Sequence, residues 1–260
     1  MKEITLNGHP TWAQLPKKGG DVVVLLHGGM SSSESLIRKV GPRLATHFRL
    51  GAFDRRGHGR TADTDEPFSY ESMADETIAF LEFIGRRAHL VGHSDGGNVA
   101  LLVALRRPDL VKRVVVIGAV FNYDGLVDPP EIDFESDDFV EWTSVYGTMS
   151  PNGSAHAKVM AVKSERMLKS GPTLDLAHMR QIEVPVLVMA GDDDVATLAH
   201  TCAMYESIPE SQLAIVPGAS HALLKERTKE CTRIISRFLT GDIPPVTLMP
   251  IRRAKSDPDA

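Results

Sequence analysis

Residues 90–100 read Leu-Val-Gly-His-Ser-Asp-Gly-Gly-Asn-Val-Ala, and this stretch decides the fold. A short apolar run leads into Gly92-His93-Ser94-Asp95-Gly96, a G-x-S-x-G pattern, and apolar residues at helical spacing follow. Strand, G-x-S-x-G and helix in this order are typical of a serine held in a sharp turn, with its hydroxyl exposed above a sheet. A glycine-rich turn with an incidental serine is the plainer interpretation, but the strand and helix on either side disfavour it.

A serine hydroxyl is a weak nucleophile, so it requires a base that is itself oriented by a carboxylate. We expect both partners at the carboxyl ends of later strands. One strand-like run leads into three adjacent acids, Asp192, Asp193 and Asp194, and the last one leads into His221. The order along the chain is therefore Ser94, an acid and His221. The residues themselves leave the choice of acid open, and for His221 a surface or helix-capping role is the plainer alternative.

Two backbone N–H groups are expected to stabilise an oxyanion beside Ser94. The run Leu26-His27-Gly28-Gly29-Met30 places small residues directly after a buried strand. These small residues let a backbone N–H, which we assign to Gly29, face the nucleophile. The second donor is the N–H of Asp95, at the start of the helix that follows Ser94. A plain glycine turn is the alternative for residues 28–29.

The rest of the chain alternates short apolar runs with amphipathic helical stretches such as residues 73–84. This alternation predicts a parallel sheet with helices on both faces. Asn7-Gly8, between Ile4–Leu6 and a segment around Trp12, predicts a hairpin before it. The strands are expected at 22–26, 48–53, 88–91, 113–117, 186–189 and 213–216.

The alternation stops between residues 121 and 181, which contain no strand-like run, so we expect an inserted cap of short helices there. The core is then expected at residues 1–120 and 182–240. Residues 241–260 contain four prolines and little apolar content after Ile251, a composition that predicts a mobile tail.

These motifs in this order resemble the α/β-hydrolase superfamily, from the Asn7-Gly8 hairpin to a helix ending near Leu239. The resemblance implies an α/β-hydrolase fold, with a mostly parallel central sheet of about eight strands, helices on both faces and a small helical cap. It also implies that Asp194 is the acid that orients the histidine. The run Asp54-Arg55-Arg56-Gly57-His58-Gly59 resembles the D-x-R-G-x-G loop of the family, a structural neighbour of the site to which we assign no catalytic role.

The expected activity is that of a serine hydrolase, carboxylesterase-like, which cleaves a small carboxylic ester, thioester or lactone through an acyl-enzyme. A cofactor-free haloperoxidase or perhydrolase would use the same three residues, and a non-catalytic ligand receptor on this fold is a further alternative. No cofactor and no metal are expected, because the histidines lack metal-ligand spacing. Residues 57–62 formally match G-x-G-x-x-A, a pattern of dinucleotide-binding loops. Acids and Pro67 follow where the helix of such a site should begin, so a dinucleotide-binding site is disfavoured.

Substrate preference is expected to depend on the cap, which opens with many acids and has no Lys or Arg between residues 121 and 157. A solvated acidic face is the plainer explanation, and attraction of a cationic substrate is the sharper one. Asp95 next to Ser94 resembles the valacyclovir-hydrolase group of amino-acid ester hydrolases, in which the acid after the nucleophile contacts the substrate amine. Trp142 and Tyr146 are candidates for lining the substrate pocket, although such residues are more often core.

Composition excludes several other classes of protein. The 260 residues include 29 Lys and Arg against 34 Asp and Glu, and the resulting net charge of -5 argues against nucleic-acid binding. The two cysteines are too few for a disulfide framework, and no apolar run approaches the ~20 residues that cross a bilayer. We therefore expect a cytoplasmic protein with a small-molecule substrate and no membrane partner. The oligomeric state is left open.

Overall fold

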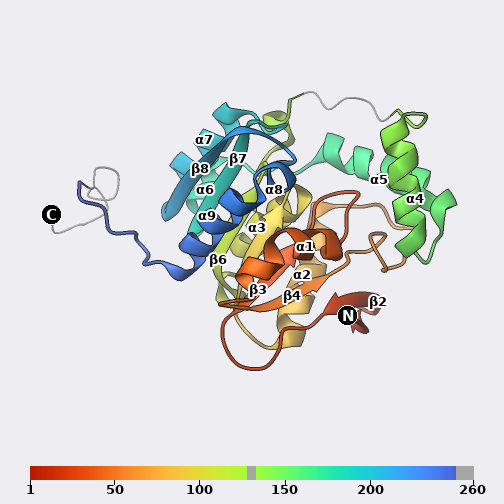
Figure 1. Ribbon diagram of the computed structural model, residues 1–260, viewed down its shortest axis with the longest axis horizontal. Coiled ribbons are helices and arrows are strands. Elements are labelled where there is room, and N and C mark those ends of the chain that lie inside the picture. Colours follow the sequence, from red (N-terminus) through yellow and green to blue (C-terminus); the bar gives the residue numbers. More distant parts are fainter. Residues whose placement is uncertain (128–132, 250–260) are drawn as a thin grey trace.

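The computed structural model describes residues 1–127 and 133–249, and one eight-stranded sheet runs through its centre (Figure 1). The order across the sheet is β1-β2-β4-β3-β5-β6-β7-β8. β1 pairs with β2, and β2 with β4, in antiparallel fashion, and every other neighbouring pair is parallel. The expected mostly parallel sheet of about eight strands is confirmed. Its strands are β1 (Lys2–Leu6), β2 (His9–Gln14), β3 (Val22–Leu26), β4 (Arg49–Phe53), β5 (Ala88–His93), β6 (Val111–Ile117), β7 (Val186–Asp193) and β8 (Ser211–Ser220).

The hairpin between β1 and β2 forms where Asn7-Gly8 predicts it. Both residues have positive φ angles, 48° and 78°, the backbone conformation that a tight two-residue turn requires. Leu6 pairs with His9 next to the turn, so the register follows directly from the turn.

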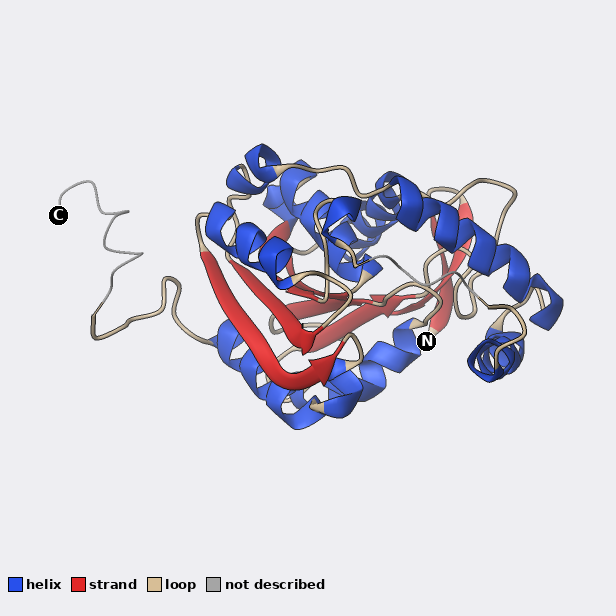
Figure 2. Ribbon diagram, turned by 90° about the horizontal axis from the view of Figure 1, so that it is seen from above, coloured by secondary structure: helices blue, strands red, loops and turns tan. Residues whose placement is uncertain are grey.

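Helices cover both faces of the sheet, as Figure 2 shows from above. Alternate residues of β3 belong to two separate core clusters. Val22 and Val24 pack with α2 and α3, whereas Val23 and Leu25 pack with α1 and α9. A strand buried on both sides carries no polar alternation, which explains its continuous apolar sequence. The helices are α1 (Ser33–Leu44), α2 (Tyr70–Ile84), α3 (Asp95–Arg106), α4 (Asp137–Met149), α5 (Ala157–Ser170), α6 (Leu176–Arg180), α7 (Leu198–Ser207), α8 (Leu223–Glu226) and α9 (Thr228–Thr240).

Because β3, β5, β6, β7 and β8 are parallel, their carboxyl ends lie along one edge of the sheet. In open α/β sheets this edge is where ligands bind. The loops that leave it carry every residue expected to take part in catalysis.

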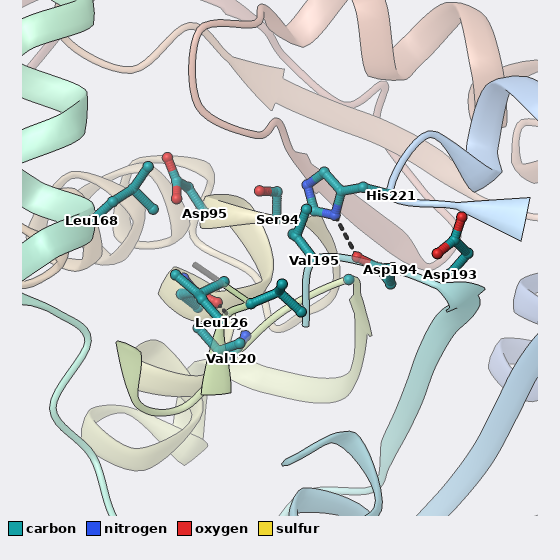
Figure 3. Close-up of a pocket in the computed structure, with 12 residues that line it drawn as sticks. Ser94, Asp95, Val120, Leu126, Leu168, Asp193, Asp194, Val195 and His221 are labelled. Carbon is teal, nitrogen blue, oxygen red and sulfur yellow. Dashed lines mark hydrogen bonds and ion pairs between the residues drawn. The ribbon is translucent and has the colours of Figure 1, made fainter. Parts of the chain in front are cut away.

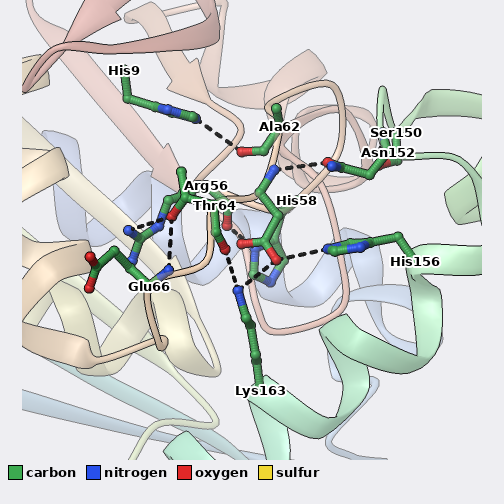
Figure 4. Close-up of polar contacts among 11 residues, drawn as sticks. His9, Arg56, His58, Ala62, Thr64, Glu66, Ser150, Asn152, His156 and Lys163 are labelled. Carbon is green, nitrogen blue, oxygen red and sulfur yellow. Dashed lines mark hydrogen bonds and ion pairs between the residues drawn. The ribbon is translucent and has the colours of Figure 1, made fainter.

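The segment between β6 and β7 folds into helices α4, α5 and α6, and α4 and α5 lie to one side of the sheet in Figure 1. A polar contact joins this segment to the loop after β4 (Figure 4). The Asp63 carboxylate, whose side chain is 1% exposed, accepts from Lys163 Nζ on α5 and from His156 Nε2, both at 2.8 Å. The boundaries of the core and the cap stay a prediction.

The end of the described chain, residues 241–249, contains neither helix nor strand, and the rest of the expected tail lies outside the described residues. None of the helices in the described part of the chain combines the length and the apolar character needed to cross a membrane.

Candidate active site

Ser94 lies between β5 and α3 in a strained backbone conformation, with φ 53° and ψ -124°. The glycines on either side are required by close packing. A Cβ at Gly92 would lie 2.1 Å from the carbonyl oxygen of Gly96, and a Cβ at Gly96 would lie 2.0 Å from that of Leu26. Neither distance is possible for real atoms, so the turn can form only with glycine at both positions. Close backbone packing at residues 92 and 96 is therefore the physical reason for the two glycines of the G-x-S-x-G pattern.

His221 and Asp194 form a hydrogen-bonded pair beside Ser94 (Figure 3). His221 Nδ1 and Asp194 Oδ1 are 2.7 Å apart, and the Asp194 side chain is fully buried while that of His221 is 30% exposed. Burial raises the pKa of Asp194, but the hydrogen bond and charge of His221 and the nearby backbone N–H groups outweigh it, so the pKa lies below its usual range. A carboxylate here holds the imidazole with Nδ1 protonated and Nε2 available to accept a proton.

The structure separates the three adjacent acids, among which the residues themselves leave the choice open and the family resemblance implies Asp194. The Asp192 carboxylate accepts a hydrogen bond from the N–H of Ala219 at 3.1 Å, and such backbone bonds lower its pKa. Asp193 has an exposed side chain at the rim of the pocket. Asp194 is the one that reaches the His221 imidazole.

Gly118, at the end of β6, is a site residue that the sequence analysis missed. It has a φ of 55°, and a Cβ at this position would lie 2.9 Å from His221 Nδ1 and 3.0 Å from Asp194 Oδ2. The histidine and aspartate therefore pack directly against a bare backbone. A glycine after a buried strand was the only available signal in the sequence, and many glycines share it.

His93, which precedes Ser94, supports His221 from the other side. Its Nε2–H donates to the carbonyl oxygen of His221 at 3.0 Å, and the two rings pack at a tilt of 34° with centroids 4.9 Å apart. Burial, followed by the positive charge that His221 can carry, lowers the pKa of His93 to about 4. His93 is therefore neutral near pH 7 and adds no positive charge beside the expected base.

Gly29 and Asp95, the two residues expected to supply the oxyanion donors, lie next to each other. Asp95 is the first residue of α3, and the first N–H groups of a helix have no acceptor within it. A Cβ at Gly29 would lie 2.5 Å from Asp95 Oδ2, and one at Gly28 would lie 3.2 Å from Ser94 Cβ. Residues 28–29 thus adjoin the nucleophile and its neighbour, where an oxyanion hole is expected.

The Asp95 side chain is buried and accepts a hydrogen bond from the Tyr70 hydroxyl at 2.7 Å. Burial and then the Asp95 charge raise the pKa of Tyr70 well above its usual value, so the phenol keeps its proton. One Asp95 oxygen is therefore occupied by Tyr70, while the residue also lines the pocket beside Ser94.

The pocket at this edge has a volume of about 430 Å³ and a mainly aliphatic lining beyond the residues already named. Leu126 and Val127 come from the segment after β6, Leu168 from α5, and Val195 from the loop after β7. The sequence analysis did not select these residues, because side-chain directions in the insertion cannot be derived from its sequence.

Trp142 and Tyr146, which the sequence analysis expected in the pocket, do not line it. The Trp142 indole N–H donates to the carbonyl oxygen of Met30 at 2.6 Å, and its ring packs on that of Tyr146, with centroids 5.3 Å apart. Tyr146 is buried in the core. Trp142 instead attaches α4 to the loop that follows β3, and Tyr146 packs against the Trp142 ring.

Comparison with known proteins shows which family the chain belongs to. The model of the "Alpha/beta hydrolase family" matches residues 23–234. The 2-hydroxy-6-oxo-6-(2'-aminophenyl)hexa-2,4-dienoic acid hydrolase of Metapseudomonas resinovorans is similar, with 27% identity over 85% of this chain and 84% of the relative. The pimeloyl-[acyl-carrier protein] methyl ester esterase of Nitrosomonas europaea is 26% identical over 78% of this chain and 89% of its own.

A solved structure of a serine hydrolase involved in carbazole degradation, the CarC enzyme, superposes with a TM-score of 0.73 and 25% identity, covering 92% of this chain and 98% of that one. The chain therefore belongs to the α/β hydrolase family and is an enzyme of that family.

Proposed function

We propose that the chain is a serine hydrolase that cleaves a small carboxylic ester, thioester or lactone through an acyl-enzyme. The observation that carries the proposal is the convergence of Ser94, His221 and Asp194 on one pocket, with the acid fully buried behind the imidazole. The similar esterase and serine hydrolase are consistent with this chemistry.

The proposed cycle assigns one role to each group. Ser94 Oγ attacks the substrate carbonyl while His221 Nε2 takes its proton, and Asp194 stabilises the imidazolium through Nδ1–H. The N–H groups of Gly29 and Asp95 stabilise the oxyanion of the tetrahedral intermediate. His221 then donates the proton to the leaving oxygen or sulfur. Water, activated by the same histidine, hydrolyses the acyl-enzyme and restores Ser94.

The charge of the pocket indicates which substrates it accepts. Among the described residues that line it, Asp194 is bonded to His221, Asp95 and Asp193 are two further acids, and none is Lys or Arg. An anionic substrate would meet two carboxylates and no cation, so a neutral ester or one with a protonated amine fits better. The aliphatic lining suits an apolar acyl or alcohol group.

The proposal is tested with a fluorophosphonate probe, which labels activated serines, and with three p-nitrophenyl esters that carry a neutral, an α-amino or a terminal carboxylate acyl group. We expect Ser94→Ala to abolish labelling and to lower turnover at least ~10³-fold, because the groups act as a unit. Ser220→Ala is the matched control, since Ser220 precedes His221 but bonds Glu226 instead of facing the pocket. The carboxylate ester should be the poorest substrate.

Labelling of purified Ser94→Ala would refute the assignment of the nucleophile. A wild-type protein that is not labelled and turns over none of the esters would favour the non-catalytic receptor. Preference for the carboxylate ester would contradict the substrate class and leave the mechanism intact.

A further inference from the structure

We propose that Arg55 is a positioning residue of this site, which sets the orientation of the peptide bond between Gly28 and Gly29 and so directs the Gly29 N–H toward the oxyanion. The inference rests on the proposed function. It assigns a role to a residue of the 54–59 loop, to which the sequence analysis assigned none.

Arg55 follows β4 by two residues, and it is only 1% exposed. Its Nη1 donates to the carbonyl oxygen of His27 at 2.5 Å, and its Nη2 donates to that of Gly28 at 3.1 Å. One planar guanidinium thus holds two successive carbonyl groups of the loop after β3. The rigid fork of arginine suits such paired contacts, which a lysine ammonium cannot reproduce.

His27 adds a third contact, and we call the hydrogen bonds of Arg55 and His27 to the carbonyl oxygens of residues 27 and 28 the clamp. The backbone N–H of Arg55 donates to His27 Nε2 at 3.2 Å, so this nitrogen carries no proton. Burial, followed by the charge of Arg55, lowers the pKa of His27 well below its usual value, so the ring is neutral. Its proton therefore sits on Nδ1, which donates to the carbonyl oxygen of Gly28 at 2.8 Å. The Gly28 carbonyl accepts two hydrogen bonds from the same side.

The direction of the Gly29 N–H follows from peptide geometry. The bond between Gly28 and Gly29 is not among the cis peptides, and in a trans peptide the C=O and the N–H point in opposite directions. With the Gly28 oxygen held against Arg55 and His27, the Gly29 N–H points away from them. The same peptide adjoins Ser94 and Asp95.

A clamp is needed here because two glycines in succession leave the backbone unusually free to rotate. A flipped peptide would present the Gly28 carbonyl oxygen to the oxyanion and remove one donor. Burial lowers the pKa of Arg55, and the charge of Asp95 opposes this lowering more than that of any other acid. The clamp favours an anion at Ser94 by keeping the Gly29 N–H available to it.

The test compares Arg55→Met, Arg55→Lys and wild type, with Arg56→Met as the matched control. Arg56 is the next residue of the same loop, but it donates to Thr64 Oγ1 (Figure 4) and to the Pro67 carbonyl, and it has no part in the clamp. For Arg55→Met we expect kcat to fall about 10- to 100-fold, less than the ~10²–10³-fold that follows loss of an oxyanion donor, with KM within threefold of wild type. The kcat of Arg55→Lys should lie between those of wild type and Arg55→Met.

A second measurement is the affinity for an alkyl boronic acid, which becomes a tetrahedral anion on the serine. Loss of a residue with a structural role only would leave this affinity unchanged. This affinity should drop in parallel with kcat in Arg55→Met and stay constant in Arg56→Met. A crystal structure of Arg55→Met should show the 28–29 peptide flipped or in two orientations.

A folded Arg55→Met protein with wild-type kcat and boronate affinity would overturn the inference, as would a crystal structure with the 28–29 peptide unmoved. If Arg55→Met does not fold, Arg55→Lys decides in the same way, because it keeps the buried charge. Failure of the proposed function shows separately, as absence of probe labelling in wild type, and the crystal structure still reports the peptide orientation.

Discussion

Replacement of Gly118 by alanine should damage catalysis through a single methyl group. The added Cβ would lie 2.9 Å from His221 Nδ1 and 3.0 Å from Asp194 Oδ2, whereas ordinary contacts begin near 3.4 Å. The imidazole and the carboxylate must therefore move by a few tenths of an ångström, away from the positions in which His221 lines the same pocket as Ser94.

The magnitude of the effect has two parts. An alanine at a φ of 55° costs about 1 kcal/mol of backbone strain, and one extra methyl group in a packed site costs about 1–3 kcal/mol. Since a 1 Å misplacement can cost ~10²-fold in rate, a displacement of a few tenths of an ångström should lower kcat about three- to tenfold with little effect on KM. Gly118→Ala should thus lose about 2–4 kcal/mol of unfolding free energy together with kcat.

The control is Gly85→Ala, because Gly85 ends α2 with a nearly equal φ of 62° and has no atom within 4 Å of an added Cβ. This variant should show the backbone strain alone, about 1 kcal/mol in urea unfolding, with wild-type kinetics. Comparing the two variants by urea unfolding and ester hydrolysis isolates the contact with the imidazole. Equal stability loss in both, with unchanged kcat in Gly118→Ala, would show that His221 and Asp194 are not confined by this glycine.

Two further predictions concern carboxylates. Asp194→Asn should lower kcat by about 10³- to 10⁴-fold and Asp192→Asn or Asp193→Asn by less than tenfold, since the imidazole bonds Asp194 alone; a larger loss in either neighbour would move the acid there. Asp63→Asn should lower the unfolding free energy at pH 7 by about 2 kcal/mol, because Lys163 loses its charged partner. Burial raises the pKa of Asp63, but its partners Lys163 and His156 hold that pKa below the usual range. The stabilisation is therefore present above the unfolded-state pKa of about 4 and is lost as the pH falls through the lower folded-state value. Urea unfolding from pH 7 to pH 3 should show the gap between the two proteins narrowing, and a gap of constant size over this range would exclude the ionic origin.

Much of the fold could be predicted because its signals are local. A strand buried on both faces must be apolar at every buried position, so β3 can be recognised as a run of Val and Leu, and β6 from its buried last four residues, 114–117. Asn7-Gly8 specifies its own turn. The strained turn at Ser94 could be predicted for the same reason. The glycines at fixed spacing around the serine follow from the backbone geometry of the turn itself.

What the sequence by itself determined about this protein is therefore its sheet, the sharp turn at Ser94 and the chain order of Ser94, the acids and His221. Tertiary structure showed what separates Asp194, which the family resemblance implied, from its two neighbours: Asp194 reaches His221, whereas the Asp192 carboxylate accepts from the Ala219 N–H and Asp193 is exposed. It also decided that Trp142 packs against the loop after β3 instead of lining the pocket, and that Arg55 clamps that loop. These outcomes depend on contacts between residues 27 to 112 positions apart in the chain, and such contacts leave no local pattern to read.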